Sequence, residues 1–242
     1  MASAGRAESS EPACPLGVCD GSGWIAGPED LARPCECREQ RRQRSRTKGI
    51  SSVLPPRYRG VSFDRPPVSD MARDLQARGA VTKVRHYVDD LDDRLGHGRG
   101  LWLFGSAGTG KTTLAMLVSK AAIEAGKSVA IYSLPKLLGR IRMSYDAAPG
   151  GDDYGALFER LTTVDLLHID DLGAEKTTDW VLEQLYALVN ERYEAERSII
   201  VTTNLELVEL EQQIGSRTVS RLSQICEPIP LYGDDRRYGE AA

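Results

Sequence analysis

The chain has 242 residues, of which 41% are hydrophobic and 27% are charged. This length suits one ordinary α/β domain with a small appendage, and the composition is typical of a globular protein. The sequence has no apolar run near the ~18 residues that a membrane span requires, and the polar N-terminus lacks the apolar core of a secretory signal. We therefore expect a cytoplasmic protein with no membrane partner, whose five cysteines do not form structural disulfides.

The net charge of −4 is unevenly distributed along the chain. Residues 33–60 hold nine Arg or Lys and two Glu, a formal charge of +7, so the rest of the chain carries −11. Such a basic segment on an acidic body indicates either an acidic or polyanionic partner near that segment or a solvated linker. The charge alone does not decide between these two.

Composition divides the chain into five parts. Residues 1–12 are small and polar, as is typical of a disordered tail. Residues 13–38 hold four cysteines and little apolar matter, and residues 39–69 are a basic linker followed by a proline-containing strap. Residues 70–232 show regular apolar patterns, and residues 233–242 form a tail.

Strands and helices are predicted to alternate in the regular region. Apolar spacings of three and four predict an amphipathic helix over residues 81–95, which ends at Gly96. Strands are expected over 101–104, 128–133, 165–170, 198–203 and 228–231. Helices are expected over 111–125, 136–145, 180–193, 207–213 and 216–225. This alternation predicts an α/β fold with a parallel sheet covered by helices on both faces.

A glycine-rich segment, Gly105-Ser-Ala-Gly-Thr-Gly-Lys111-Thr112, follows the first of these strands and opens a helix. Its glycines would let backbone N–H groups close around phosphate oxygens, at a helix N-terminus that favours anions. Lys111 would reach the β- and γ-phosphates, and Thr112 would place its hydroxyl on Mg²⁺. The predicted nucleotide-binding residues are Gly105, Ser106, Ala107, Gly108, Thr109, Gly110, Lys111, Thr112 and Thr113. We expect the ligand to be ATP with Mg²⁺.

Two carboxylates follow the apolar run that predicts the third strand. The carboxyl ends of parallel strands share one edge, so Asp170 and Asp171 are expected beside the phosphate-binding loop. Asp170 would hold Mg²⁺, also as a nucleotide-site residue, and Asp171 would act as general base towards water. Because Asp171 is shorter than a Glu, the sequence predicts nucleotide binding more firmly than efficient hydrolysis. His168, inside the apolar run, is interpreted as a packed strand residue.

Three further polar residues are candidates for catalysis. Asn204 ends the fourth strand, where it would orient the lytic water, although Asn also favours turns. Arg217 and Arg221 are four residues apart, on one face of a short helix. Either they approach the γ-phosphate of a neighbouring subunit, or they are ordinary surface arginines.

The N-terminal cysteines form two pairs, Cys14-x4-Cys19 and Cys35-x-Cys37, separated by 15 residues. Four thiolates at such spacings can bind Zn²⁺ tetrahedrally and stabilise a segment that has no apolar core. The spacings are irregular for such a site, so a non-metal role stays open. The distant Cys226 is expected in the core.

Residues 136–145 predict a short basic amphipathic helix. Its apolar residues would face the body, which leaves Lys136, Arg140, Arg142 and Tyr145 exposed. Basic groups beside an aromatic ring are what a non-specific single-stranded DNA groove uses, and an ordinary surface helix is the alternative.

The order of these motifs resembles that of the AAA+ ATPases that load bacterial replicative helicases (DnaC-type) and their relatives that assist transposition (IstB-type). The resemblance covers about residues 50–232. It is carried by the phosphate-binding loop, Asp170-Asp171-Leu-Gly-Ala-Glu, Trp180, Asn-Glu-Arg-Tyr (190–193), Thr-Thr-Asn-Leu (202–205), Ser-Arg-Leu (220–222) and Pro55-Pro56-Arg57-Tyr58.

The resemblance implies a P-loop NTPase fold of the AAA+ type, without a full C-terminal lid domain and with ATP at the interfaces of a homo-oligomer. It implies that Arg221 acts on a neighbouring subunit with Arg217 in support, and that the core binds single-stranded DNA. Our first hypothesis is a helicase loader, a slow and assembly-dependent ATPase whose zinc module docks a replicative helicase. The alternatives are a transposition helper that delivers a transposase and a nucleotide-gated adaptor that hydrolyses little ATP.

Overall fold

The computed structural model describes residues 14, 16–20, 22–27, 32–37, 54–145, 153–173 and 178–236. The chain divides into two units, Met1–Lys48 and Gly49–Ala242, and each is described by itself. The predicted tail over residues 1–12, most of the basic linker and residues 237–242 lie outside the described part. None of the described helices is long and apolar enough to cross a membrane.

The first unit contains a short antiparallel hairpin of β1 (Trp24–Ala26) and β2 (Ala32–Pro34). A turn precedes it, in which the Gly17 N–H donates to the Cys14 carbonyl at 3.0 Å. Gly17 has a φ of 63°, a conformation that glycine adopts without steric cost. The buried residues of this unit include three cysteines, with Cys19 and Ile25 packed against them, so side chains with metal-ligand chemistry occupy the place of an apolar core.

The second unit is built on a five-stranded parallel sheet in the order β4-β5-β6-β3-β7. The strands are β3 (Gly100–Phe104), β4 (Val129–Ser133), β5 (Leu166–Asp170), β6 (Ser198–Thr203) and β7 (Cys226–Pro230). The predicted parallel α/β sheet is therefore confirmed. After β3 the chain crosses to the far edge of the sheet and returns through β5 and β6 to the side of β3, before β7 adds on the other side.

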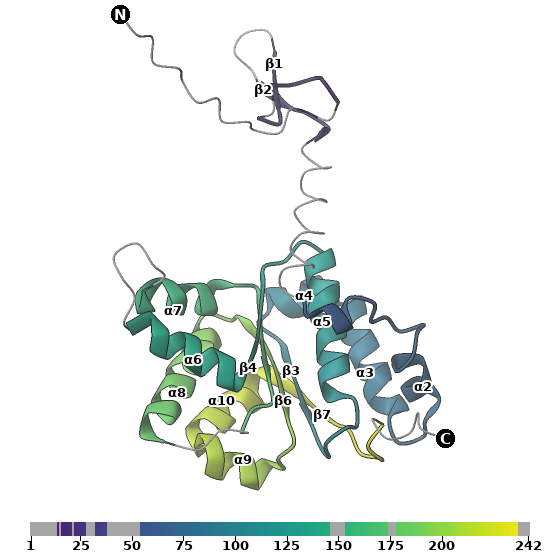
Figure 1. Ribbon diagram of the computed structural model, residues 1–242, viewed down its shortest axis with the longest axis vertical. Helices are drawn as coiled ribbons and strands as arrows, with labels where there is room; N and C mark the ends of the chain where they lie inside the picture. The colour runs from purple at the N-terminus through teal and green to yellow at the C-terminus, as the bar shows by residue number, and fades with distance from the viewer. Residues whose placement is uncertain are drawn as a thin grey trace, which may run out of the picture. The chain divides into compact units, whose positions relative to one another are not determined.

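Helices cover both faces of this sheet (Figure 1). One face is covered by α2 (Val68–Arg73), α3 (Arg78–Asp89), α4 (Leu91–Gly96) and α5 (Lys111–Glu124). The other is covered by α6 (Leu134–Tyr145), α7 (Tyr154–Thr163), α8 (Asp179–Glu194), α9 (Leu207–Ile214) and α10 (Ser216–Ile225). A 3-10 turn, η2 (Pro56–Tyr58), lies against α5.

The two apolar cores follow from the period of two residues along each strand. In β3, Leu101 and Leu103 belong to the core under α3 and α5, whereas Trp102 belongs to the core under α8 and α10. In β6, Ile200 faces the first core and Ile199 the second. Strands that are buried on both faces have near-continuous apolar runs, as their sequences show.

Two helical segments differ from the sequence prediction. The helix expected over residues 81–95 is interrupted at Asp90, whose φ of −99° and ψ of 20° leave the helical region, so it forms α3 and α4. The sequence interpretation also missed α7, whose first turn is capped by the Asp153 carboxylate accepting from the Ala156 N–H at 2.8 Å. Gly155 in that turn weakens the helical signal, and the cap compensates for it.

A buried arginine fixes the beginning of the central strands. Arg192 of α8 is 0% exposed. Its Nη1 donates to the Leu161 carbonyl at 2.7 Å, and its Nη2 donates to those of Val164 at 3.0 Å and Ser198 at 2.5 Å. One planar guanidinium thus satisfies backbone acceptors from the end of α7, the turn between α7 and β5, and the start of β6.

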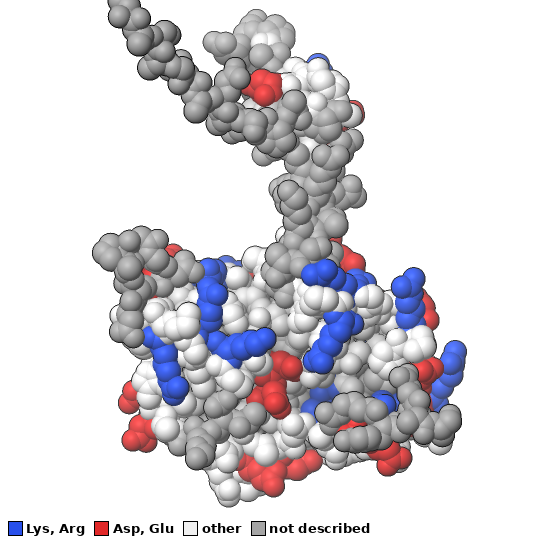
Figure 2. Space-filling view, in the orientation of Figure 1, with Lys and Arg blue, Asp and Glu red and all other residues white. Residues whose placement is uncertain are grey.

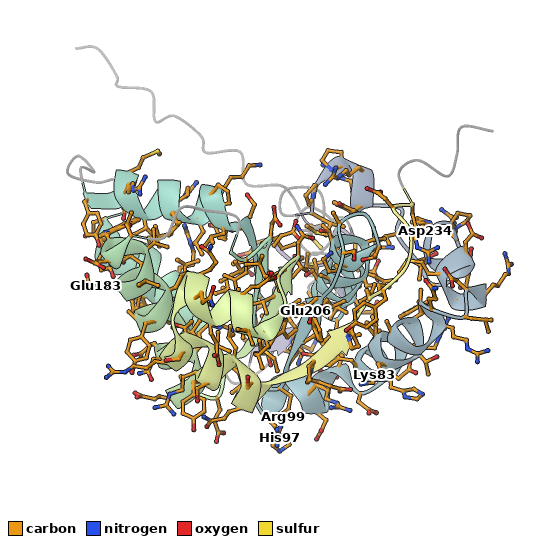
Figure 3. The ribbon with its side chains drawn as sticks, turned by 90° about the horizontal axis from the view of Figure 1, so that it is seen from below. Lys83, His97, Arg99, Glu183, Glu206 and Asp234 are labelled. Atoms are coloured by element: carbon orange, nitrogen blue, oxygen red, sulfur yellow. The ribbon has the colours of Figure 1, made fainter. Side chains whose placement is uncertain are left out.

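All five strands point the same way, so the sheet has one amino edge and one carboxyl edge. In Figure 3, His97 and Arg99, which precede β3, lie at the lower edge of the view, and Asp234, which follows β7, lies towards its upper right. In parallel α/β sheets, ligands bind outside the carboxyl ends of the strands, at the point where the chain order reverses.

Candidate nucleotide-binding site and cysteine cluster

The glycine-rich loop connects β3 to the first turn of α5, as the sequence predicts. Gly108 and Gly110 have φ values of 76° and 103°, which residues other than glycine rarely adopt. A Cβ on Gly110 would also lie 2.7 Å from Cε of Met71 in α2. The loop therefore needs these glycines for its backbone conformation, and Gly110 also packs closely against Met71.

Lys111 is buried at the start of α5, and its ammonium group is held within the loop. Its Nζ donates to the carbonyls of Gly105 at 2.7 Å and Ser106 at 2.6 Å. The Thr109 hydroxyl donates to the same Ser106 carbonyl at 3.0 Å. A cation and a helix N-terminus thus occupy one point of the loop, an arrangement that attracts phosphate.

Asp170, the last residue of β5, accepts hydrogen bonds from two hydroxyl groups. Its Oδ1 accepts from the Thr112 hydroxyl at 2.8 Å and from the Thr202 hydroxyl at 2.7 Å. Oxygen atoms from α5, β5 and β6 therefore converge, and carboxylate and hydroxyl oxygens are the donors that Mg²⁺ prefers. The residues fit a magnesium site in which Thr112 and Asp170 would hold the ion beside the phosphate-binding loop.

Asp171 and Asn204 form a second polar pair at the same edge. Asp171 has a φ of 61°, and its N–H donates to the Thr202 hydroxyl at 2.9 Å. The Asn204 amide donates to Oδ1 of Asp171 at 3.1 Å. Both side chains are exposed, so the pair can present a carboxylate and an amide to the same water molecule.

One cavity of about 410 Å³ joins these groups. It is lined by Arg57, Tyr58, Ala107, Gly108, Gly110, Lys111, Thr112, Thr113, Asp170, Asp171, Thr202 and Asn204. The structure thus brings most of the predicted nucleotide-site residues together with Asp171 and Asn204. The sequence interpretation did not assign site roles to Arg57, Tyr58 or Thr202, although Arg57 and Tyr58 stand in the Pro55-Pro56-Arg57-Tyr58 motif and Thr202 precedes Asn204 by two residues.

His168 is a fully buried strand residue, as the sequence interpretation expected. Its Nδ1 lies 3.0 Å from the Ser119 hydroxyl of α5. Burial lowers the pKa of His168 to about 4, against the opposing charge of Asp170. The imidazole is therefore neutral near pH 7 and ties α5 to β5 behind Asp170.

Arg217 and Arg221 are not among the described residues that line the cavity. Arg217 is exposed, and Arg221 is half-buried with its guanidinium 4.2 Å from the ring centroid of Tyr193 in α8. This cation–π contact joins two of the motifs that carried the sequence resemblance. It holds Arg221 at the surface of the subunit, outside this cavity.

The segment after β7, residues 231–236 (the C-terminal arm), lies along the phosphate-binding loop. The Leu231 N–H donates to the Phe104 carbonyl at 2.8 Å, and the Arg236 N–H donates to the Gly108 carbonyl at 3.2 Å. The Arg236 guanidinium pairs with Asp74. A Cβ on Gly108 would overlap the Asp235 carboxylate, so the arm packs directly against this glycine. The sequence interpretation treated residues 233–242 only as a tail.

The predicted basic helix is present as α6. Leu137, Leu138 and Ile141 are buried, and Lys136, Arg140, Arg142 and Tyr145 are exposed, as predicted. On the face shown in Figure 2, Lys and Arg side chains lie over α6.

Two of the exposed α6 side chains are already engaged with aromatic rings. The Arg142 guanidinium lies 4.7 Å from the Trp180 ring centroid. Tyr145 stacks on Tyr154 with 4.8 Å between ring centroids, so one of its faces is covered.

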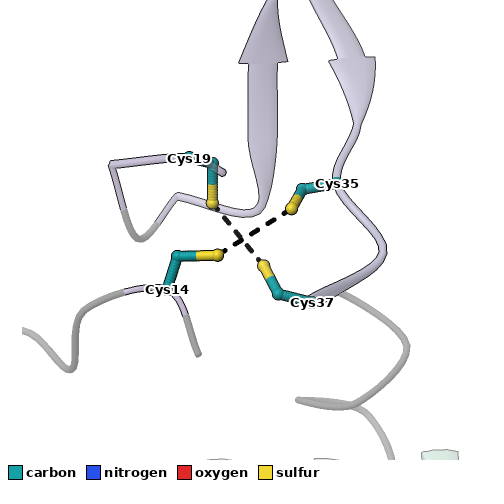
Figure 4. Close-up of side chains that lie close together, drawn as sticks. All are labelled: Cys14, Cys19, Cys35 and Cys37. Carbon is teal, nitrogen blue, oxygen red and sulfur yellow. Dashed lines mark hydrogen bonds between the residues drawn. The ribbon is translucent and has the colours of Figure 1, made fainter. Parts of the chain in front are cut away.

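The four N-terminal cysteines point their sulfur atoms at one centre (Figure 4). The Sγ atoms all lie within 4.8 Å of one another, with 3.9 Å between Cys14 and Cys35 and 3.5 Å between Cys19 and Cys37. Tetrahedral coordination with Zn–S bonds of about 2.3 Å would place sulfurs about 3.8 Å apart. The cluster therefore fits a zinc ion whose role would be structural. Cys226 lies apart from it, in the core of the second unit.

Comparisons of the sequence and of the fold with known proteins point to the same family. A model of IstB-like ATP binding proteins matches residues 88–238, which is more than half of the chain. The chain is 25% identical over 218 residues to the replicative helicase loader DnaI of Bacillus subtilis (strain 168), a match that covers 83% of this chain and 65% of the relative. It is 25% identical over 186 residues to the replicative helicase loader DnaC of Escherichia coli (strain K12), covering 76% of this chain and 72% of the relative. A crystal structure of the DnaC helicase loader shares the fold, with a TM-score of 0.63 and 24% identity over 74% of this chain and 100% of that chain.

Proposed function

Since this chain belongs to the family of IstB-like ATP-binding proteins, we propose that it is an ATP-dependent loader of a replicative helicase. The observation that carries this proposal is the single cavity in which Lys111, Thr112 and Asp170 meet Asp171 and Asn204. The names of the relatives DnaI and DnaC support helicase loading as the use of that nucleotide.

In this proposal the cavity binds ATP with Mg²⁺ and hydrolyses it slowly. Lys111 neutralises the β- and γ-phosphates, Thr112 and Asp170 hold the ion, and Asp171 accepts the proton of a water that Asn204 orients. The bound ion would withdraw charge from the phosphate oxygens. The distance of 3.1 Å between the Asn204 amide and the Asp171 carboxylate supports a shared role for this pair.

A neighbouring copy of the chain supplies one further cation. Arg221 is held at the subunit surface by Tyr193, outside its own cavity, where it can approach the γ-phosphate bound by a second copy. Arg217, four residues before it on the exposed side of α10, supports that contact. Nucleotide binding then favours assembly, because each interface is completed by two subunits.

Single-stranded DNA binds along α6 in this proposal. Lys136, Arg140 and Arg142 contact phosphates, and Tyr145 stacks a base on the face that Tyr154 leaves open. Charge-removing variants of these residues should weaken binding to an unstructured oligonucleotide and reduce its salt dependence. Unchanged affinity and salt dependence would remove α6 from the DNA-binding surface.

The cysteine module docks the helicase. Beside the cysteine cluster, Leu16, Val18 and Trp24 are 40%, 53% and 41% exposed, so they offer apolar surface that a partner can cover. A rigid zinc-bound scaffold would hold these side chains ready for an apolar surface of the partner.

Two alternatives rest on specific observations. The sequence also resembles the IstB-type ATPases that assist transposition, so the same core could deliver a transposase instead of a helicase. Asp171, with its short side chain and its bond to Asn204, favours an adaptor that binds ATP but hydrolyses little of it.

The decisive experiment measures helicase loading on circular single-stranded DNA with the full chain and the replicative helicase of the same organism. We expect the wild type with ATP to increase unwinding of an annealed oligonucleotide, and Lys111→Ala to abolish this increase. The matched control is Lys83→Ala, which removes an exposed cation of α3 outside the cavity. No increase with the wild type, together with nucleotide-dependent capture of a transposase, would favour the transposition helper.

A further inference from the structure

A second cation lies in the nucleotide cavity of the same subunit. Arg57 and Tyr58 of η2 line the cavity together with Lys111, Asp170 and Asp171. The Arg57 guanidinium lies 4.6 Å from the ring centroid of Tyr58. Among the ion pairs between described residues, none includes Arg57.

The backbone around Arg57 is held firmly in place. The Tyr58 N–H donates to the Pro55 carbonyl at 2.9 Å, and the Val61 N–H donates to the Tyr58 carbonyl at 3.1 Å. Lys120 of α5 donates to the Val61 carbonyl at 2.8 Å, which attaches this segment to the helix that follows the phosphate-binding loop. Pro56 also restricts the backbone at the first turn. Arg57 therefore does not need a partner subunit to reach the cavity.

The charge balance of the cavity lining favours a second cation such as Arg57. Its lining side chains include two carboxylates, Asp170 and Asp171, and two cations, Lys111 and Arg57. Without Arg57, the lining would carry a net negative charge, in a site that must receive the negative phosphates of a nucleotide. A bidentate guanidinium is the side chain that suits phosphate oxygens best.

The Arg57–Tyr58 pair lines the cavity together with Asp170. Burial raises the pKa of Tyr58, Arg57 opposes that shift, and the charge of Asp170 adds to it. The Tyr58 hydroxyl is thus within electrostatic reach of Asp170, the residue that fits the magnesium site. Arg57, on the Tyr58 ring, lines this cavity together with Thr112 and Asn204.

We propose that Arg57 contacts the terminal phosphate of the nucleotide bound by its own subunit and so makes the site distinguish ATP from ADP. This inference rests on the proposed nucleotide-binding function and adds a specificity-determining residue to it. Arg57 acts within its own subunit, and Arg221 acts across the interface.

The test compares the binding of a non-hydrolysable ATP analogue and of ADP, each with Mg²⁺, to the full chain by calorimetry. For Arg57→Gln we expect affinity for the analogue to fall about 10–100-fold, as for a lost charged hydrogen bond, and affinity for ADP to change less than about 3-fold. Arg57→Lys should restore part of the preference for the ATP analogue over ADP, because lysine keeps the charge but lacks the planar guanidinium that can bind two phosphate oxygens at once. The control Arg65→Gln removes an exposed arginine of the same segment that lies outside the cavity lining, and should leave both affinities unchanged.

Each other outcome contradicts the inference. An equal loss for both nucleotides, with unchanged thermal unfolding, would place Arg57 against the base or ribose. Unchanged affinity for the analogue would show that Arg57 does not contact the ligand. A wild type that binds neither nucleotide would overturn the proposed function itself, and a wild type that binds both while Arg57→Gln behaves like Arg65→Gln would overturn this inference alone.

Discussion

The hydroxyl of Thr202 donates to the Asp170 carboxylate at 2.7 Å and accepts from the N–H of Asp171 at 2.9 Å. A single oxygen atom of β6 therefore fixes both the side chain at the end of β5 and the backbone of the next residue. Asp171, in its left-handed conformation, depends on this bond for its direction.

Replacing Thr202 by Val removes that oxygen and keeps the shape of the side chain. We expect Mg²⁺-dependent ATP hydrolysis to fall roughly 10–100-fold, because Asp170 and Asp171 lose their positions relative to the phosphates. The free energy of unfolding should fall by about 1–3 kcal/mol, since Thr202 is 2% exposed and its partners lose a buried hydrogen bond. Steady-state hydrolysis and urea unfolding measure the two effects. Thr202→Ser should behave like the wild type; equal losses in both variants would assign the effect to packing.

Lys111→Ala should abolish detectable nucleotide binding, because it removes the cation that the loop carbonyls of Gly105 and Ser106 hold at the start of α5. Binding of a fluorescent ATP analogue measures this, with Lys83→Ala as the variant that should retain full affinity. Retained ATP affinity in Lys111→Ala would contradict the whole account of the cavity.

A mixing experiment tests whether Arg221 acts across an interface. Arg221→Ala and Asp171→Asn proteins should each hydrolyse little ATP alone. Their mixture should recover part of the activity, because one type of mixed interface holds an intact Asp171 opposite an intact Arg221. Assembly must be checked in parallel by sedimentation. Assembly without recovered hydrolysis would count against the role of Arg221.

Arg192 is expected to matter for stability and not for chemistry. Arg192→Met leaves the buried carbonyls of Leu161 in α7, of Val164 just after α7 and of Ser198 in β6 without this donor, at a cost of about 3 kcal/mol or more in the free energy of unfolding. Arg197→Met is the matched control, because Arg197 forms a half-exposed ion pair with Asp165 whose loss should cost less than about 1 kcal/mol. Urea unfolding of both variants distinguishes them, and equal costs would show that the buried guanidinium is not needed.

The cysteine cluster should bind about one zinc ion per chain in protein purified without added metal. Cys37→Ser should lower the zinc content and expose the first unit to proteolysis, because its buried cluster is made of the ligands themselves. Cys226→Ala changes a cysteine of the second unit and should leave the zinc content unchanged. Elemental analysis measures the zinc content, and limited proteolysis measures the protection of the first unit. A first unit that is folded without metal would contradict the prediction of a zinc module.

Much of the second unit could be predicted from the sequence, because its strands are apolar on both faces and its motifs stand at strand ends. The loop, Asp170, Asp171 and Asn204 were identified in this way, since parallel strands place their carboxyl ends at one edge. The break at Asp90 was not predictable, because the apolar spacing continues from α3 into α4 and only the backbone departs from the helix.

The residues near the cavity that the sequence did not predict were missed for one common reason. Arg57 and Tyr58 enter the cavity from a strap whose position depends on packing against α5, more than fifty residues along the chain. The C-terminal arm reaches Gly108 in the same way, through the ion pair between Arg236 and Asp74. Sequence patterns report local periodicity and cannot reveal such long-range approaches.

The C-terminal arm also offers a way to observe the site. Its backbone is hydrogen-bonded to the phosphate-binding loop at Gly108, whereas Asp234 of the same arm is exposed and does not line the cavity. A fluorescent amino acid at position 234 would therefore lie beside the loop without replacing any group that binds nucleotide. Its emission should follow each binding and release event in real time, in single subunits as well as in assemblies.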